Sequence, residues 1–358
     1  MGRMTRRGGS LVCASDKFRG TATASEVGDA VGSAASVYGW HTTVVPVSDG
    51  GEGFLEAIAG RFESGRFTGP DGNHVIARWG WARTNSPEER TAVLETAQVS
   101  GLLLAGGAQR NDPVTATSYG VGEQVMAAVD AGATTAIIGC GGSASTDGGW
   151  GMISAIRERG GLPERFKLIA AVDVQTPFTD AARIFAPQKG ANPATVENLT
   201  LRLRQQAETY RTEFGVDLSG VPGSGAAGGI SGAVFALGGK ITSGFDLVAN
   251  LFDLRSTIET ADLVVTGEGR LDATSLNGKV VGGVLRTVDS RVPLLVVVGT
   301  ATADAIRMVR AAHPDTSLIS LEEAFGLERA MGETAALITQ VIGDHLKSLQ
   351  SEVADVRS

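Results

Sequence analysis

The residues that could do chemistry are concentrated in four glycine-rich segments, each of which follows an apolar run. They read Ser-Asp-Gly-Gly-Glu-Gly at 48–53, Gly-Gly-Ser-Ala-Ser-Thr-Asp-Gly-Gly at 141–149, Gly-Ser-Gly-Ala-Ala-Gly-Gly at 223–229 and Thr-Gly-Glu-Gly-Arg-Leu-Asp at 266–272. Glycine lets a backbone turn sharply and approach a ligand closely, while carboxylates among glycines can hold a hard cation or accept a proton. The combination predicts phosphate and metal chemistry, although any one segment could simply turn the chain. The preceding apolar runs are typical of buried strands.

Transfer of a γ-phosphoryl group would use these residue types. The reaction needs Mg²⁺ to bridge phosphate oxygens, fixed cations or N–H groups to take up charge, and a carboxylate that orients or deprotonates the acceptor hydroxyl. The carboxylates assigned to the metal and the acceptor are Asp49, Glu52, Glu268 and Asp272, the first three as metal ligands. Either Asp49 or Asp16 could be the base. Each carboxylate could instead cap a helix or satisfy loop amides.

A cation and a helix start complete the candidate site. Lys189 stands in the tight turn 187–190, where it could neutralise phosphate charge, the alternative being a solvated surface cation. Segment 141–149 leads from a strand-like run into the helical sequence 150–156, which favours anion binding at a helix N-terminus, the alternative being an N-cap without a ligand. The residues predicted to bind nucleotide or phosphate are Gly141, Gly142, Ser143, Ser145, Asp147, Gly225 and Gly228.

Composition and charge exclude several classes of protein. The 358 residues are 42% hydrophobic and 20% charged, enough for a substantial core and, by length, two domains. A net charge of -8 argues against nucleic acid or an anionic membrane surface as partner, because both need a basic footprint. Cys13 and Cys140 lack metal-ligand spacing and are expected to be reduced, buried thiols. No signal peptide or membrane span is recognisable, so we expect a cytoplasmic protein.

Short apolar runs alternate with amphipathic helical segments, as in parallel α/β folds. Thr23 and Glu26 form the pattern of a capping box that opens a helix toward Tyr38. Period-two runs at 74–81 and 91–95, separated by the turn-like 84–87, predict a hairpin. The other predicted strands are 11–14, 42–47, 136–140, 168–172, 262–265, 293–298 and 317–321.

This order predicts a discontinuous Rossmann-like parallel-sheet domain, 1–65 with 260–358, interrupted by an inserted α/β domain at 66–259. Ligands of open parallel sheets bind at the carboxyl ends of strands. Segments 16–20, 48–53 and 266–272 would share such an edge of the first domain. The inserted domain would bring its own loops against them, leaving a cleft that can close and exclude water.

Six motifs together closely resemble, in the same order, the signatures of the bacterial glycerate kinase family, class I. They are Asp16-Lys-Phe-Arg-Gly20, the four glycine-rich segments and Ala186-Pro-Gln-Lys-Gly-Ala191, and the similarity runs from about Leu11 to the C-terminal helices. The resemblance implies ATP- and magnesium-dependent phosphorylation of D-glycerate at the 2-hydroxyl. It also implies the discontinuous Rossmann-like domain with its insertion. A homodimer is left open.

Roles for individual residues follow from the motifs. The expected catalytic residues are Asp16, Asp49, Lys189, Glu268 and Asp272, and the expected substrate-binding residues are Lys17, Arg19, Asp173 and Arg270. Lys17 and Arg19 would bind the glycerate carboxylate, the guanidinium in a bidentate manner. The sequence departs from the family pattern at Ser15, Lys17, Ser48, Thr176 and Ala186, none of which removes a charged motif residue. The position of the acceptor hydroxyl and the loop that binds adenine stay open.

Two other functions compete with this interpretation. Gly223-Ser-Gly-Ala-Ala-Gly228 matches the dinucleotide fingerprint, with Asp246 downstream, and suggests an NAD(P)-dependent oxidoreductase of a small hydroxy acid. That fingerprint must follow a strand, and 218–222 is a poor one. A catalytically inactive sensor of sugar acids or nucleotides could use the same fold. The carboxylates retained in the glycine-rich segments argue against an inactive protein.

Overall fold

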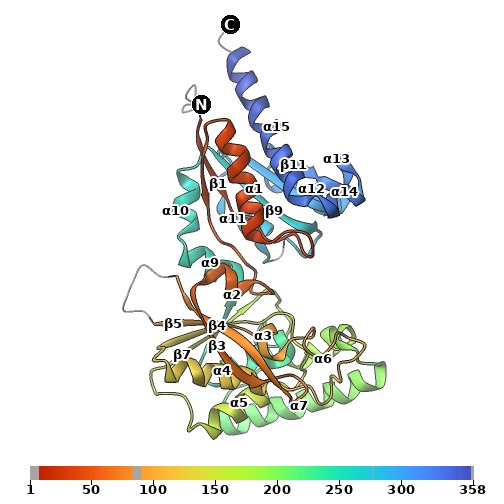
Figure 1. The fold of residues 1–358 in the computed structure, drawn as a ribbon. Helices are drawn as coiled ribbons and strands as arrows, with labels where there is room; N and C mark the ends of the chain where they lie inside the picture. The colour runs from red at the N-terminus through yellow and green to blue at the C-terminus, as the bar shows by residue number, and fades with distance from the viewer. Residues whose placement is uncertain (1–7, 84–89, 277, 356–358) are drawn as a thin grey trace. The chain divides into compact units, whose positions relative to one another are not determined.

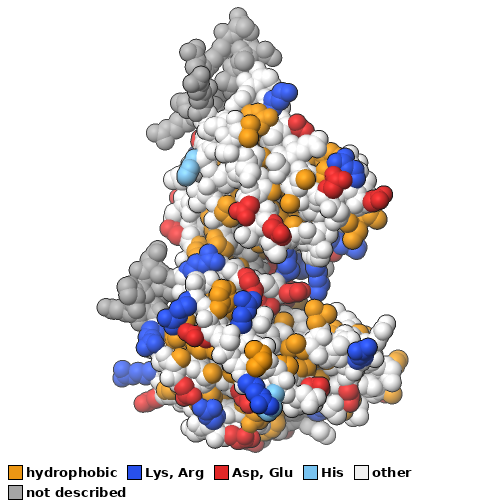
Figure 2. All heavy atoms as spheres, viewed as in Figure 1, with side chains coloured by type: hydrophobic (Ala, Val, Ile, Leu, Met, Phe, Trp, Pro, Cys, Tyr) orange, Lys and Arg blue, Asp and Glu red, His pale blue; other side chains and the backbone are white. Residues whose placement is uncertain are grey.

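The computed structural model of the chain describes residues 8–83, 90–276 and 278–355 (Figure 1). The chain forms two compact units, one made of Met1–Ser48 with Val248–Ser358 and the other of Asp49–Leu247. Figure 2 shows acidic and basic side chains interspersed over the visible surface of each unit. Both units combine a sheet dominated by parallel strands with helices, which confirms the predicted α/β class.

The discontinuous unit is built around a five-stranded sheet in the order β11-β10-β9-β1-β2, in which every neighbouring pair is parallel. Its strands are β1 (Ser10–Cys13), β2 (His41–Val44), β9 (Leu263–Leu271), β10 (Leu294–Ala301) and β11 (Ser317–Ser320). The N-terminal and C-terminal segments that form this unit are joined where β1 pairs with β9, with Leu11 opposite Leu263. A mainly aliphatic core fills the space between the sheet and helices α1 (Ala24–Val37) and α15 (Thr334–Asp355).

The helices of this unit begin where the sequence supplies caps. In α1 (Ala24–Val37), the Thr23 side chain accepts from the Glu26 amide and the Glu26 carboxylate accepts from the Thr23 amide, which confirms the predicted capping box. Thr302 caps α12 (Ala303–Ala312) with its side chain alone, which accepts from the Ala305 amide at 3.3 Å. The remaining helices are α10 (Leu254–Glu259), α11 (Val280–Thr287), α12 (Ala303–Ala312), α13 (Leu321–Phe325), α14 (Leu327–Gly332) and α15 (Thr334–Asp355).

The second unit contains a six-stranded sheet in the order β3-β4-β5-β6-β7-β8. Its strands are β3 (Ala59–Thr68), β4 (His74–Ala82), β5 (Thr91–Glu95), β6 (Thr135–Gly139), β7 (Lys167–Val172) and β8 (Lys240–Ser243). The pairs β3·β4 and β4·β5 are antiparallel and the others are parallel. The predicted hairpin is therefore confirmed as β4 and β5, while its turn at 84–87 lies outside the described residues.

Helices and short 3₁₀ turns connect the strands of this sheet. The α-helices are α2 (Phe54–Ile58), α3 (Ala97–Ser100), α4 (Tyr119–Asp130), α5 (Trp150–Glu158), α6 (Ala181–Phe185), α7 (Pro193–Phe214), α8 (Ile230–Ala236) and α9 (Gly244–Leu251), the last of which continues into the discontinuous unit. The 3₁₀ turns are η1 (Phe178–Asp180), η2 (Pro187–Lys189) and η3 (Ala226–Gly229). The helix expected from residue 150 is confirmed as α5.

The unit boundaries differ from the predicted ones. They fall between Ser48 and Asp49 and between Leu247 and Val248, not at 65/66 and 259/260. The change at the first boundary follows from strand pairing, because β3 begins at Ala59 and pairs with β4 along its whole length. The loop before it also packs on the inserted sheet, as described below. The acidic loop 49–53 is thus part of the inserted unit rather than of the Rossmann-like one.

Segment 266–272 was expected to be a loop, and this is wrong for most of its length. Residues up to Leu271 continue β9, which pairs with β10 as far as Ala301. Its glycines admit neighbouring backbone instead of turning the chain, since a Cβ on Gly267 would fall 1.9 Å from the carbonyl oxygen of Val297. A strand rich in glycine is difficult to recognise because it lacks the branched side chains typical of strands.

Candidate active site

In the inserted unit, the acidic loop 49–53 lies directly against the glycine-rich loop 141–149. A Cβ on Gly141 would fall 2.5 Å from Cα of Gly51, and a Cβ on Gly50 would fall 2.8 Å from the carbonyl oxygen of Ala171. These contacts place the loop at the carboxyl ends of β6 and β7, where ligands of parallel sheets bind. Within the loop, the Asp49 carboxylate accepts a hydrogen bond of 3.0 Å from the Gly51 amide, a turn that fixes its orientation.

Glu95, at the end of β5, anchors the far side of the acidic loop. Its carboxylate accepts hydrogen bonds from the amides of Gly53 (3.3 Å) and Leu55 (3.1 Å), at the start of α2, and the residue is only 2% exposed. A carboxylate is favourable at a helix N-terminus because it accepts from amides that have no partner within the helix. Glu95 was not among the residues predicted from the sequence. Its signal was an acidic residue that ends a buried strand without a glycine beside it.

The backbone of loop 141–149 is held by an unusual set of side chains. Five consecutive carbonyl groups, from residue 144 to residue 148, each accept a hydrogen bond from a different side chain elsewhere in the unit. The pairs are Ala144 with Asn111 (3.2 Å), Ser145 with Lys189 (2.6 Å), Thr146 with Arg202 (2.5 Å), Asp147 with Gln206 (2.8 Å) and Gly148 with Tyr210 (2.6 Å). None of these donors except Lys189 was identified from the sequence. The four donors other than Lys189 are polar residues outside the glycine-rich motifs.

Lys189 is buried, with 4% of its surface exposed, so the alternative of a solvated surface cation is wrong. Its ammonium group donates to the Ser143 hydroxyl at 2.9 Å and to the Ser145 carbonyl at 2.6 Å. Burial lowers the pKa of Lys189 to about 7, although the negative charge of Asp147 acts in the opposite direction. Turn 187–189 is therefore joined to loop 141–149 through a lysine whose pKa lies close to neutral pH.

Asp147 has a structural set of partners. Its carboxylate accepts from the amide and hydroxyl of Ser118, at 2.8 and 2.7 Å, and from the amides of Gly149 (3.1 Å) and Gly151 (3.2 Å). These bonds secure the start of α5, which supports the capping alternative for this residue over its predicted role in binding nucleotide or phosphate. Ser145 is fully buried, and its hydroxyl accepts from Ser100 at 3.3 Å. Ser143 is thus the hydroxyl of this loop that directly meets the cation.

Gly225 and Gly228, expected to bind nucleotide, have a packing role in the structure. A Cβ on Gly228 would fall 2.1 Å from the carbonyl oxygen of Ser145, and one on Gly225 would fall 2.5 Å from that of Pro177. The element that precedes them is α7 followed by turns, so the segment does not follow a strand as we expected. The dinucleotide fingerprint needs a strand at this place, and the geometry therefore disfavours the oxidoreductase alternative.

Asp173 follows β7 directly and lies at the same carboxyl edge. Its negative charge helps to raise the pKa of the neighbouring Cys140 thiol, which is raised mainly by burial. Both cysteines are free and buried, in agreement with the sequence analysis. The inserted unit therefore carries Asp49, Glu52, Asp173 and Lys189, all on or against the loops at the carboxyl edge of its sheet.

In the discontinuous unit, segment 16–20 runs beside β9. The Asp16 amide donates to the Gly267 carbonyl at 2.9 Å, and the Asp16 carboxylate accepts from the Lys17 amide at 2.8 Å. A Cβ on Gly269 would fall 3.0 Å from the amide nitrogen of Arg19, so this glycine permits the close approach. The first motif and β9 are thus brought together, as the sequence predicted for strand ends.

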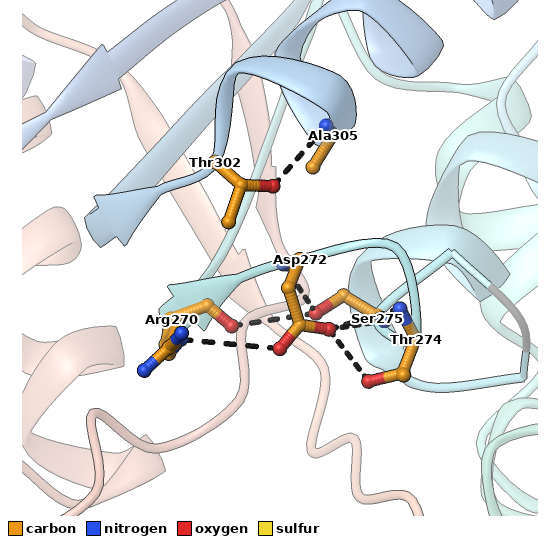
Figure 3. A network of polar contacts seen from close by, with 6 residues as sticks. All are labelled: Arg270, Asp272, Thr274, Ser275, Thr302 and Ala305. Carbon is orange, nitrogen blue, oxygen red and sulfur yellow. Dashed lines mark hydrogen bonds and ion pairs between the residues drawn. The ribbon is translucent and has the colours of Figure 1, made fainter.

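Glu268 and Asp272 differ sharply in their surroundings. Glu268 lies within β9 and is only 6% exposed. The Asp272 carboxylate accepts from the hydroxyl and amide of Thr274 and from the amide of Ser275 (Figure 3). The hydroxyl bond is the main cause of the lowered pKa of Asp272. These contacts support the alternative role of Asp272 in satisfying loop amides.

Arg270 lies on the open side of the same network. Its guanidinium Nε is 3.9 Å from the Asp272 carboxylate, and its side chain is 74% exposed (Figure 3). An exposed ion pair of this length contributes little to stability, and the substrate-binding role of Arg270 stays a prediction. The charged residues of this region of the unit are Asp16, Lys17, Arg19, Glu268 and Arg270. That Asp49, Lys189 and Glu268 act across one cleft stays a prediction.

Comparisons with known proteins agree with the arrangement of motifs. Residues 11–160 and 157–350 match the sequence model of the glycerate kinase family. The chain therefore belongs to the glycerate kinase family, and it is a kinase.

Individual relatives resemble the chain over most of its length. It is 36% identical to glycerate 2-kinase of Escherichia coli (strain K12), an alignment that covers 88% of this chain and 93% of that protein. It is 34% identical to glycerate kinase of Bacillus subtilis (strain 168), over 92% and 97% of the two chains. A crystal structure assigned to glycerate kinase 2 of Salmonella typhimurium LT2 superposes with a TM-score of 0.79 at 29% identity, covering 97% of this chain and 100% of that one.

Two findings on the described residues bear on the other expectations. No helix among them combines the length and the apolar character needed to cross a bilayer. Within the same residues, no three carboxylate, histidine or cysteine side chains gather closely enough to hold a metal ion by themselves. The metal role of Asp49, Glu52 and Glu268 therefore stays a prediction.

Proposed function

We propose that the protein transfers the γ-phosphoryl group of ATP to the 2-hydroxyl of D-glycerate. Membership of the glycerate kinase family supports the reaction class, and the similarity to a protein named glycerate 2-kinase supports the position of transfer. The observation that carries the proposal is the buried Lys189, held by loop 141–149 next to the acidic loop. A cation, glycine-rich backbone and carboxylates at one sheet edge are the parts that phosphoryl transfer needs.

The inserted unit would handle the phosphates of the nucleotide. The Lys189 ammonium would take up charge that develops on the transferred group, with Ser143 holding its direction. Asp49 and Glu52 would hold Mg²⁺, which would supply positive charge against the phosphates. Two carboxylates suit this ion, because Mg²⁺ usually keeps several waters and binds through one or two carboxylates together with substrate phosphates. A separate cage of protein ligands is not needed.

The discontinuous unit would bind the acceptor. Lys17 and Arg19 would hold the glycerate carboxylate, and Asp16 or Asp49 would accept the proton of the attacking hydroxyl. Glu268, buried in β9, would either hold Mg²⁺ together with the acidic loop or orient the acceptor. We place the reaction in the cytoplasm, because both thiols are free and ATP is the proposed donor.

An ADP-release assay over a panel of small hydroxy acids, followed by phosphorus NMR of the product, tests the proposal. We expect Mg²⁺-dependent ADP release with D-glycerate and coupling of the product phosphorus to the proton on C2. Coupling to the C3 protons would overturn the 2-hydroxyl assignment. Binding of ATP and glycerate without ADP release would identify a sensor, and oxidation of NAD(P)H with a hydroxy-acid product would identify an oxidoreductase.

A further inference from the structure

Helix α7 (Pro193–Phe214) is held firmly at both ends. Asn192 caps its start by accepting from the Thr195 amide at 2.9 Å, and Pro193 occupies the first helical position. Gly215, with a φ of 69°, ends it in the left-handed conformation. Buried Leu199 and Leu203 pack one side of the helix into the core of the inserted unit. The helix is therefore a rigid element from which side chains can act at fixed positions.

Three polar residues of α7 hold three consecutive carbonyl groups of the glycine-rich loop. Arg202, Gln206 and Tyr210 stand four residues apart, so they lie on one face of the helix. They donate to the carbonyls of residues 146, 147 and 148, in the same order along both segments. Eight helical residues rise about 12 Å, whereas two steps of extended chain span at most about 7 Å. The guanidinium and phenol must therefore converge on the loop, which only long side chains can do.

The loop itself has little regular structure with which to keep this shape. Gly148 and Gly149 have φ values of 68° and 74°, a conformation that glycine adopts freely in the unfolded chain as well. There is no room at this contact for a side chain, since a Cβ on Gly148 would fall 2.2 Å from Oε1 of Gln206. Fixing such a segment requires bonds from outside it. The α7 side chains supply three of them.

We propose that α7 positions the phosphate-handling loop: Arg202, Gln206 and Tyr210 hold its carbonyls so that Ser145 and Ser143 keep the Lys189 ammonium in place. The inference rests on the proposed phosphoryl transfer. Thr146, which Arg202 holds, directly follows Ser145, whose carbonyl accepts from Lys189. A shift of the loop would therefore move the partners of the cation. Misplacement of a reacting group by about 1 Å can cost on the order of 10² in rate.

Variants of the three donors separate positioning from stability. In Gln206→Met the donor is lost together with Oε1, a buried oxygen with no hydrogen-bond partner among the described residues. Its removal offsets part of the cost of losing the bond, so the melting temperature should change little. We expect kcat to fall by about tenfold or more with the KM for D-glycerate unchanged. Arg202→Met and Tyr210→Phe should lower kcat similarly, and Arg202→Lys should restore part of it by keeping one donor.

Neighbours on the same helix provide matched controls. Gln205 and Arg204 are exposed, and Gln205→Met and Arg204→Met should keep kcat within about twofold of the wild type. Hydrogen exchange of the amides of 144–149 should be faster in Arg202→Met and Gln206→Met than in these controls. Unchanged kcat and unchanged exchange in the three donor variants would overturn the inference. If the wild type does not phosphorylate glycerate, the proposed function fails, while the exchange comparison still decides whether α7 holds the loop.

Discussion

The ammonium nitrogen of Lys189 lies 2.6 Å from the carbonyl oxygen of Ser145, and its second hydrogen-bond partner is the neutral hydroxyl of Ser143. Neutral oxygens compensate a buried positive charge less well than a carboxylate does. The pKa of Lys189 is accordingly lowered to about 7 by burial. An arriving phosphate would supply the missing negative charge and favour the protonated form. The lysine is thus suited to bind an anion reversibly.

The depressed pKa of Lys189 predicts a particular dependence of stability on pH. Below about pH 7 the folded protein carries a desolvated cation, whereas between about pH 7 and 10.5 the unfolded chain binds more protons at this residue than the folded one. The free energy of unfolding contributed by Lys189 therefore rises with pH across this window. Because methionine does not titrate, the wild type should gain stability relative to Lys189→Met as pH rises from 7 to 10. Urea unfolding at several pH values measures the difference, and a constant difference would contradict the prediction.

Asp49→Asn tests the negative charge of the acidic loop without disturbing its shape. The amide oxygen of asparagine can still accept from the Gly51 amide, so the turn should persist and the melting temperature should stay close to that of the wild type. We expect kcat to fall on the order of 10² or more, because part of the charge that holds the metal and the acceptor is lost. Asp217 makes the same kind of turn with the Ser219 amide at 2.9 Å, and Asp217→Asn is the matched control. Near-normal turnover of Asp49→Asn would remove this residue from the mechanism.

Strands, the capping box and the motif residues were accessible to sequence reasoning because each has a local signature. The pairing of Leu11 with Leu263 joins residues 252 positions apart, yet two apolar runs in an alternating pattern sufficed to predict that they share a sheet. The prediction of a loop at 266–271 was wrong because the glycines there permit close backbone packing in β9 and do not form a turn. The first predicted domain boundary was wrong because β3 lacks the regular alternation of apolar and polar residues that made its partner β4 recognisable as a strand.

The support of loop 141–149 could not be read from the sequence for a different reason. On a helix such as α7, Arg202 and Gln206 at a spacing of four residues have the pattern of a solvated face. Their partners are backbone carbonyls. Every residue has a backbone carbonyl, so the residue type does not indicate which one is an acceptor. Glu95 was not predicted for the same reason, since its bonds from Gly53 and Leu55 come from backbone amides. Unlike the local capping box, contacts between a side chain and a backbone group far away in the sequence have no pattern that could predict them.

Gly228→Ala should disrupt the contact between the two glycine-rich segments. A Cβ at this position would fall 2.1 Å from the Ser145 carbonyl, and the φ of 68° is unfavourable for alanine by roughly 1–2 kcal/mol before any clash. We expect a loss of stability of about 2 kcal/mol or more, together with lower kcat, because the displaced carbonyl is a partner of Lys189. Gly220, which has no atom within 4 Å of the added Cβ, gives the control Gly220→Ala. Equal urea midpoints for the two variants would contradict the packing role.

Asn111→Asp tests the remaining support of the site, which joins the loop to the lysine turn. The side-chain amide of Asn111 donates to the carbonyls of Ala144 (3.2 Å) and Lys189 (2.8 Å), and an aspartate would place a carboxylate against both oxygens. Leaving two partly buried acceptors unpaired should cost about 1–3 kcal/mol in the free energy of unfolding. The fall in kcat should exceed what the loss of stability alone explains. The reason is that Asn111 no longer ties the backbone of Lys189 to loop 141–149, to which the Lys189 side chain also binds. Urea unfolding and steady-state kinetics measure both effects, with the exposed Asn198→Asp on α7 as control. A variant that loses stability but keeps its kcat would show that this bond stabilises the unit without positioning the lysine.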